Sequence, residues 1–142
     1  NPRELTRLAA DFGARDACWI GERLYVAAGS KGTAFYDPES SARPLGFLPP
    51  SRSAQHVACE ASQVAVSNMG STIQLFDVLP TGTPLERART RVHRSSPTGR
   101  SRFDGTRLWV AVDAAGMGLL DLADPANPER VLPRRREFKV SY

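Results

Sequence analysis

GTRLWVAVDAAGMGLLDLADPANP, residues 105–128, carries the pattern that decides the fold of this chain. An apolar run, LWVAV, precedes a glycine-containing turn, then a second apolar run that ends at Asp121, and finally a proline at position 128. Short apolar runs bounded by turn residues are typical of β-strands that are covered on both faces. This stretch therefore predicts neighbouring buried strands joined by a tight turn.

The same pattern occurs twice more at nearly constant spacing. The first apolar residue of each copy is Leu24, Val64 or Leu108, separated by 40 and 44 residues. The aspartate that closes the second apolar run and the proline that opens the next segment show the same two spacings, at Asp37, Asp77 and Asp121 and at Pro44, Pro84 and Pro128. Three residue types that share one pair of spacings establish a threefold repeat.

Each repeat unit contains four short segments with the character of strands. We expect strands at 16–20, 24–28, 33–37 and 44–48 in the first unit, 56–60, 64–68, 72–77 and 84–89 in the second, and 100–104, 108–113, 116–121 and 128–132 in the third. Four strands in a period of 40 to 45 residues are the signature of a β-propeller blade. The prediction is an all-β fold of three four-stranded antiparallel blades packed face to face.

Three blades are too few for a ring, because known propellers close with about four to eight. We expect one propeller segment over 1–142, with blades at 14–48, 54–89 and 100–132 and a tail or the start of a further blade at 133–142. Residues 1–13 are either the end of a preceding blade or a short helix capped by Asn1, with Pro2 at its first position. A longer chain or a partner chain would complete the ring, and a C2 dimer would give six blades.

The strings YVAAGSKGTAFYDPES, SNMGSTIQLFDVLPTGTP and WVAVDAAGMGLLDLADPANPE resemble LVIVD repeats. The third unit matches this family best, at Leu119, Leu120, Asp121, Leu122, Asp124, Pro125, Asn127 and Pro128. The first unit departs from it at Tyr36, and the second has LPTGTP in place of the DPxNP turn. The resemblance implies blade architecture and a periplasmic or cell-surface location, whereas its packing and turn residues imply no activity.

Composition limits the function classes. The chain has 142 residues, a net charge of +4, 41% hydrophobic and 24% charged residues, which is typical of a soluble globular protein. It contains no apolar run near the ~20 residues that span a bilayer. Its first residues, NPRELTRLAADFG, lack the regions of a secretory signal.

The inner strands supply one candidate site. Asp16, His56 and Arg100 each lie eight residues before the landmark of their unit. This position is where the first strand of each blade leaves one face of the propeller beside the central channel. An acid, an imidazole and a guanidinium that converge at the channel mouth would bind a polar ligand, and the alternative is three solvated residues at strand starts.

Arginines are concentrated in RARTRVHRSSPTGRSR, residues 87–102. We expect an exposed Arg-rich loop at 90–99 that docks on an acidic protein or membrane-complex surface, because arginine pairs with carboxylates and phosphates. The residues proposed to dock are Arg89, Arg91 and Arg94, together with Arg134, Arg135 and Arg136 of the tail. Nucleic acid is disfavoured because no aromatic residues lie among these arginines to stack on bases.

Other chemistry finds little support in the sequence. Cys18 and Cys59 lie six and five residues before their landmarks, and neighbouring positions on a strand face opposite ways. A disulfide between them is therefore not expected, and both are interpreted as small buried residues. No zinc, phosphate-loop or nucleophile–base motif is present, so we predict no catalytic residues, no metal and no cofactor.

The function expected from these observations is a non-catalytic binding or scaffold module, an extrinsic subunit of a larger assembly. The alternative is a propeller enzyme, similar to a hydrolase or lactonase, with its active site at the channel mouth. Two structural expectations accompany this interpretation. Trp19 and Phe103 should be equivalent core residues, and Asp37, Asp77 and Asp121 should accept hydrogen bonds from turns.

Overall fold

The computed structural model describes residues 7–49, 52–124 and 127–131, which form an all-β fold. Its strands make three four-stranded antiparallel sheets, each assembled in chain order, as the repeat predicts. Sheet 1 contains β1 (Asp16–Ile20), β2 (Arg23–Ala27), β3 (Thr33–Tyr36) and β4 (Gly46–Leu48). Sheet 2 contains β5 (Ala54–Glu60), β6 (Gln63–Asn68), β7 (Thr72–Val78) and β8 (Pro84–Arg91). Sheet 3 contains β9 (Thr98–Asp104), β10 (Arg107–Val112), β11 (Gly116–Asp121) and β12 (Glu129–Val131), with a 3₁₀ turn at Asp113–Ala115.

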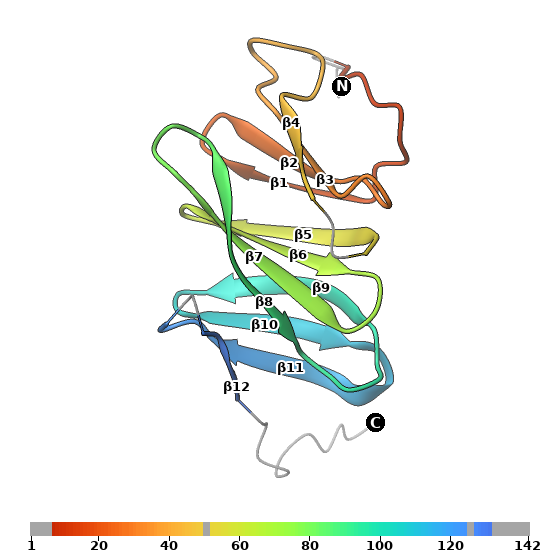
Figure 1. Ribbon diagram of the computed structural model, residues 1–142, viewed down its shortest axis with the longest axis vertical. Coiled ribbons are helices and arrows are strands. Elements are labelled where there is room, and N and C mark those ends of the chain that lie inside the picture. The colour runs from red at the N-terminus through yellow and green to blue at the C-terminus, as the bar shows by residue number, and fades with distance from the viewer. Residues whose placement is uncertain (1–6, 50–51, 125–126, 132–142) are drawn as a thin grey trace, which may run out of the picture.

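The three sheets stack face to face in the order of the chain (Figure 1). The first strands of the sheets lie next to one another, β1 against β5 and β5 against β9. This arrangement places one strand of every sheet along a common inner edge of the stack. The predicted three-sheet architecture is therefore confirmed for the described residues.

The central residues of β2 and β6 are apolar without polar alternation because both faces of these two strands are covered. Tyr25 and Ala27 of β2 pack with Val64 and Val66 of sheet 2, whereas Val26 and Ala28 lie in a separate cluster on the opposite face of sheet 1. Between sheets 2 and 3 a further cluster forms, from Ala65, Ile73, Leu75, Val92, Phe103, Leu108, Val110, Val112, Leu120 and Leu122. The absence of polar alternation in β2 and β6 thus reflects a layer on either side. Strand β10 has the same apolar character, but the described residues cover only one of its faces.

Part of the outer face of sheet 1 is covered by the start of the described chain. Leu8 and Phe12 pack against the cluster that contains Tyr36, and the Tyr36 hydroxyl donates a hydrogen bond to the Ala9 carbonyl at 3.0 Å. The Phe12 ring meets Phe47 edge-on, with centroids 5.9 Å apart. Residues 7–13 are neither strand nor helix, so over this range both alternatives from the sequence are wrong. A segment with apolar side chains covers the sheet without adding a strand to it.

The position of Trp19 corrects a prediction from the repeat. Trp19 pairs with Leu24 and Phe103 pairs with Leu108, so the two residues are equivalent in register. Phe103 is 5% exposed but Trp19 is 57% exposed. The alignment is correct, and the difference arises because sheet 3 directs Phe103 toward sheet 2, whereas no sheet of the described chain precedes sheet 1.

A disulfide joins Cys18 of β1 to Cys59 of β5, with Cα atoms 5.6 Å apart, contrary to the expectation from the sequence. As their positions in the repeat predict, the side chains of Cys18 and Cys59 leave opposite faces of their own sheets. Cys18 lies on the face of sheet 1 toward sheet 2, and Cys59 on the face of sheet 2 toward sheet 1. In stacked sheets these are the two faces that meet, so opposite phases bring the thiols together.

The turns between first and second strands place one residue of each unit in the left-handed region. Gly21 and Gly105 have φ of 55° and 58°, and the equivalent residue of sheet 2 is Ala61 with φ of 50°. An L-residue with a β-carbon is disfavoured there by about 1–2 kcal/mol. We expect Ala61→Gly to raise the free energy of unfolding by roughly 0.5–1 kcal/mol and Gly105→Ala to lower it, measured by urea denaturation. Destabilisation by Ala61→Gly would contradict this explanation.

Two of the three repeated aspartates accept hydrogen bonds from the turn that follows them, as predicted, whereas the prediction is wrong for Asp77, which lies within β7. Asp121 accepts a hydrogen bond from the Ala123 N–H at 2.9 Å, and Asp37 accepts one from the Ser40 N–H at 3.3 Å. Asp77 instead forms an ion pair with Arg87. Hydrogen bonding by Ser40, with a smaller effect of the Arg23 guanidinium, lowers the pKa of Asp37 below its ordinary value.

The lowered pKa predicts how the contribution of Asp37 depends on pH. Because the folded state favours the carboxylate, the stabilisation is present above about pH 4, the ordinary aspartate pKa, and is lost as pH falls through the lower folded value. Asp37→Asn should therefore be less stable than wild type at pH 7, and the gap should narrow at pH 3. Urea denaturation at both pH values measures this gap, and a gap that widens in acid would contradict the assignment.

Candidate functional site at the inner strands

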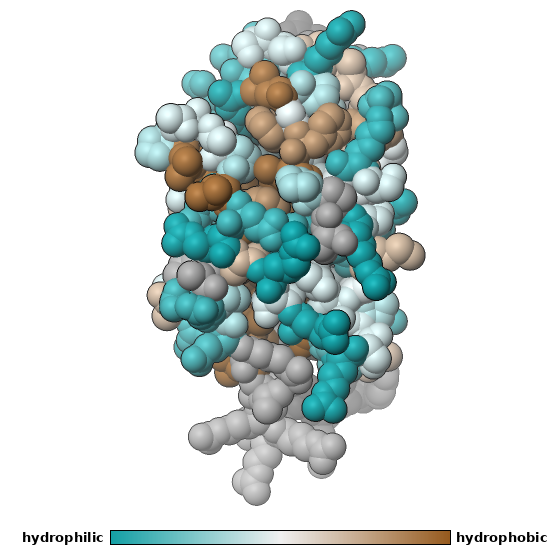
Figure 2. All heavy atoms as spheres, viewed as in Figure 1, coloured by the Kyte–Doolittle hydropathy of each residue, from teal (hydrophilic) through white to brown (hydrophobic). Residues whose placement is uncertain are grey.

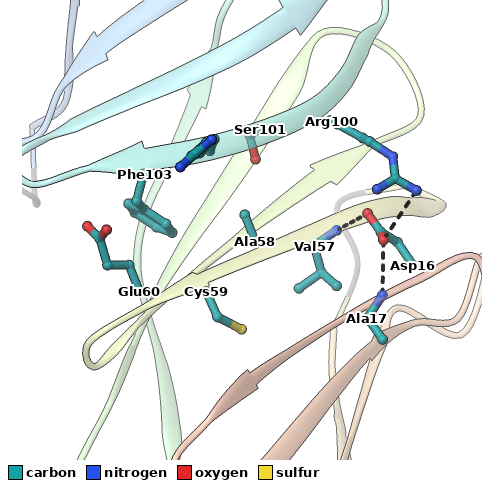
Figure 3. Close-up of a pocket in the computed structure, with 10 residues that line it drawn as sticks. Asp16, Ala17, Val57, Ala58, Cys59, Glu60, Arg100, Ser101 and Phe103 are labelled. Carbon is teal, nitrogen blue, oxygen red and sulfur yellow. Dashed lines mark hydrogen bonds and ion pairs between the residues drawn. The ribbon is translucent and has the colours of Figure 1, made fainter.

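The structure brings together the three residues singled out at the inner strands, of which Figure 3 shows Asp16 and Arg100. Asp16 begins β1, His56 lies near the start of β5 and Arg100 near the start of β9. The Asp16 Oδ2 is 3.4 Å from the His56 Nδ1, and the Asp16 Oδ1 is 3.6 Å from the Arg100 Nη2. One residue from each sheet thus meets its neighbours at a single point of the stack.

Asp16 is the centre of this group. Its carboxylate accepts hydrogen bonds from the Val57 N–H of β5 at 3.4 Å and from its own neighbour, the Ala17 N–H, at 3.1 Å. The Asp16 side chain is 12% exposed, whereas that of Arg100 is 73% exposed. The carboxylate therefore joins sheet 1 to sheet 2, and the guanidinium extends into solvent where a ligand or partner can reach it.

A polar pocket of about 290 Å³ runs along the inner strands from this group. Asp16 and Arg100 lie at one end, and Glu60 and Phe103 lie at the other, as Figure 3 shows. Ser101 and Arg102 of β9 contribute further polar groups between them. The pocket offers charged groups of both signs, which suits a small polar ligand. Among the described residues, no three His, Cys, Asp or Glu side chains lie close enough to hold a metal ion.

The Arg-rich loop is shorter than the predicted 90–99. Strand β8 continues to Arg91 and β9 begins at Thr98, so the loop itself covers 92–97. Its ends are anchored, because the Val92 N–H donates to the Ser71 carbonyl at 2.9 Å and the Thr98 N–H to the Gly70 carbonyl at 2.7 Å. The Val92 side chain lies in the core between sheets 2 and 3. An apolar residue within the arginine sequence thus holds the loop against the stack.

The arginines of this region divide into paired and unpaired groups. Arg89 makes a two-pronged contact with Glu86, through Nε at 2.9 Å and Nη2 at 3.1 Å, and Arg87 pairs with Asp77. Arg91 and Arg94 are exposed and form no ion pair with any residue that the structure describes. Of the predicted docking residues, Arg89 is therefore occupied, Arg91 and Arg94 are available, and Arg134, Arg135 and Arg136 lie outside the described residues.

Two further arginines near this region were not found from the sequence. A β-carbon at Gly29 would lie 3.4 Å from the Arg15 Nε, and one at Gly70 would lie 3.8 Å from the Arg52 Nη1. Both side chains therefore lie over the loops between second and third strands. Neither belongs to an arginine cluster in the sequence, and the alignment of the sheets places both at the same end of the stack as the loop 92–97.

No family model matches this chain, and no curated protein matches it. The crystal structure of the computationally designed Ika4 protein is similar over 96% of this chain and 82% of that chain, with a TM-score of 0.75 and 10% sequence identity. The computationally designed Ika8 protein is similar over 77% of this chain and 33% of that chain, with a TM-score of 0.63 and 11% identity. At these identities the likeness shows the fold alone.

In the described part of the chain, no helix has the length and apolar character needed to cross a membrane.

Proposed function

We propose that this chain is a non-catalytic binding and scaffold module, a segment of a propeller-type stack that is completed by a further sheet. The further sheet would pack on the outer face of sheet 3 and would come from a longer chain or from a partner chain. The module would then serve as a rigid extrinsic subunit of a larger assembly.

The single observation that carries this proposal is the uncovered outer face of sheet 3. Trp109 of β10 pairs with Leu119 of β11. The equivalent cross-strand pairs are Tyr25 with Phe35 in sheet 1 and Ala65 with Leu75 in sheet 2. The pair of sheet 1 packs against sheet 2, and the pair of sheet 2 packs against sheet 3.

The third pair lies on a face that no described residue covers. Met117 and Val131 adjoin this pair and are 53% and 40% exposed. At the equivalent positions of the preceding sheets, Tyr25, Ala65 and Leu75 are buried and Phe35 is partly buried against the next sheet. Apolar groups at positions that a neighbouring sheet covers in both preceding units support a fourth sheet as the occupant.

An extracytoplasmic location is part of the proposal. The resemblance of the third unit to LVIVD repeats suggests it, and the Cys18–Cys59 disulfide supports it independently. Disulfides persist in oxidising compartments and are rare in the cytosol. In such a compartment the module would bind its partner with the Cys18–Cys59 disulfide formed.

The mass of the native protein tests the proposal. We expect more than the three described sheets in solution, as a chain longer than the 15.5 kDa of this sequence or as an assembly of chains. Trp109→Glu should destabilise that assembly, whereas Leu85→Glu, which changes an exposed residue of β8, should not. A 15.5-kDa monomer in which the two variants behave alike would overturn the proposal.

One observation favours a second candidate, an enzyme similar to propeller hydrolases or lactonases. Asp16 and His56 form an acid–imidazole pair at 3.4 Å on the edge of a polar pocket. Such a pair can act as a general base if the carboxylate orients the imidazole. Hydrolysis of a simple aryl ester that is lost in both Asp16→Asn and His56→Ala would support this candidate. Equal rates for wild type and both variants would exclude it for that substrate class.

A further inference from the structure

The topology gives the stack two chemically different ends. In each sheet the turns between strands one and two and between strands three and four lie at one end, which we call the hairpin end. The turns between strands two and three lie at the other end with the chain segments that join successive sheets, and we call this the connector end. Figure 1 shows that the first three strands of each sheet run across the stack, with the fourth strands β4, β8 and β12 inclined more steeply, and that the turns between second and third strands gather on one side.

Backbone contacts confirm that the connector ends coincide. Gly29 of sheet 1 pairs with Ala54 at the start of sheet 2, and the Met69 N–H donates to the Ser53 carbonyl at 2.6 Å. The Gly70 carbonyl of sheet 2 accepts from Thr98 at the start of sheet 3. The connector end is therefore one continuous surface across the stack.

Charge is strongly divided between these ends. The topology and these contacts assign the charged residues near the strand ends to one end or the other. Among the described residues, the connector end carries the cations Arg15, Lys31, Arg52, Arg91, Arg94 and Arg100 and the acids Asp11, Asp16 and Asp113. The hairpin end carries the acids Glu22, Asp37, Glu39, Glu60, Asp77, Asp104, Asp121, Asp124 and Glu129 and the cations Arg23, Arg43, Arg87, Arg102 and Arg107. The modest net charge of the chain thus conceals a basic end and an acidic end.

Ion pairs do not neutralise the connector end. Lys31 pairs with Asp11, and Arg100 with Asp16. The remaining four cations, Arg15, Arg52, Arg91 and Arg94, are exposed and make no ion pair with a described residue. These unpaired like charges give the connector end a positive electrostatic potential, which attracts the anionic groups of a partner.

The unpaired arginines lie on or over neighbouring turns of the connector end. Arg52 lies over Gly70, and the loop 92–97 is hydrogen-bonded to Gly70 and Ser71 at its two ends. Arg15 lies over Gly29, which is also close to the Ser53 hydroxyl next to Arg52. The contacts therefore link the arginines through the turns of sheets 1 and 2 into one basic surface.

We propose that this connector end docks a carboxylate-rich surface of a partner protein. The inference rests on the proposed function, because it names the partner chemistry of the binding module. Guanidinium groups pair with carboxylates in a two-pronged geometry, as Arg89 already does with Glu86. Met69 is the exposed large apolar side chain in the described turns that carry or adjoin the unpaired arginines, and it has no aromatic ring. Single-stranded nucleic acid and membrane interfaces favour such rings, so a protein surface is the better match.

Charge reversals at the two ends provide a matched test. Arg91→Glu with Arg94→Glu changes the connector end, and Arg43→Glu with Arg107→Glu changes the hairpin end. All four arginines are exposed and make no ion pair with a described residue, and both double variants have the same net charge. The probe is poly-L-glutamate of fixed length, with affinity measured by titration at physiological and at high salt.

We expect the connector-end variant to bind poly-L-glutamate about tenfold or more weakly than wild type, mainly through a slower on-rate. The hairpin-end variant should stay within about twofold of wild type, because its arginines already lie among carboxylates. Equal losses in the two variants would show an effect of net charge alone and would overturn the proposal.

The partner class and the fold are controlled in the same series. Duplex DNA and phosphatidylserine vesicles are titrated in the same way. If either binds more tightly than poly-L-glutamate, and if the connector-end variant weakens that binding equally, the assignment to a protein partner is overturned. Thermal unfolding verifies that both variants fold. The mass of the assembly, which tests the proposed function, is measured on the same samples, so failure of the one proposal is distinguishable from failure of the other.

Discussion

Removal of the Cys18–Cys59 disulfide should lower the free energy of unfolding by about 4 kcal/mol. The cross-link joins residues 41 positions apart, and closing a loop of that length in the unfolded chain costs roughly this much conformational entropy. The cysteines also connect sheet 1 to sheet 2, so their removal frees the sheets from each other in the unfolded state. Denaturant unfolding of the Cys18→Ala, Cys59→Ala double variant measures the change.

Reduction of the wild-type protein is the control for this prediction. Because the stabilisation comes from the bond and not from the side chains, the reduced wild type should unfold near the midpoint of the double variant. A single Cys18→Ala variant should also match the double variant within about 1 kcal/mol. A double variant as stable as oxidised wild type would contradict the cross-link.

Phe103→Ala should lower the free energy of unfolding by about 3–5 kcal/mol, because it empties a site in the core between sheets 2 and 3. Trp19→Ala is the matched control, since Trp19 occupies the equivalent register position on the outer face of sheet 1. Its loss should be under about 1 kcal/mol in the isolated described stack, as expected for an exposed side chain.

A large loss for Trp19→Ala in the native protein would have a specific meaning. It would show that a further sheet or chain covers the outer face of sheet 1 in the assembly. A small loss for Phe103→Ala would instead contradict the packing of sheet 3 on sheet 2. Chemical denaturation of both variants under the same conditions separates these results.

The sequence was informative about everything that repeats within one unit. The landmarks at Leu24, Val64 and Leu108 predicted the three sheets because each unit forms its own hairpins from local turn and strand signals. Asp16, His56 and Arg100 were brought together by the same logic, since equivalent positions of stacked units are neighbours in space. Repetition therefore predicted the inner-strand group as well as the fold.

Relations between units were harder to predict from periodicity. Cys18 and Cys59 pair because their strands face each other from different sheets, which a phase count along single strands does not represent. Trp19 is exposed because its sheet is the first of the described stack. Arg15 and Arg52 join the basic surface because the sheets are aligned in the stack. On the face shown in Figure 2, hydrophilic side chains also spread across the middle of the molecule, where β8 runs in Figure 1.

Position within the stack, rather than position within the unit, determines what is buried at its ends. This explains why one register position is core in sheet 3 and surface in sheet 1. It also explains why the outer face of sheet 3 retains apolar residues that its own unit does not cover.

The central claim, that a further sheet covers the outer face of sheet 3, is tested most directly by oxidation of the two methionines of the chain. Met117 lies on that face and is 53% exposed in the described stack, and Met69 of the connector end is 63% exposed. The measurement is hydrogen-peroxide footprinting of the native protein by mass spectrometry, in high salt that screens charge-driven contacts at the connector end. We predict that Met69 is oxidised rapidly and Met117 at least about tenfold more slowly, with equal rates after denaturation. Equal rates in the native protein would contradict the claim.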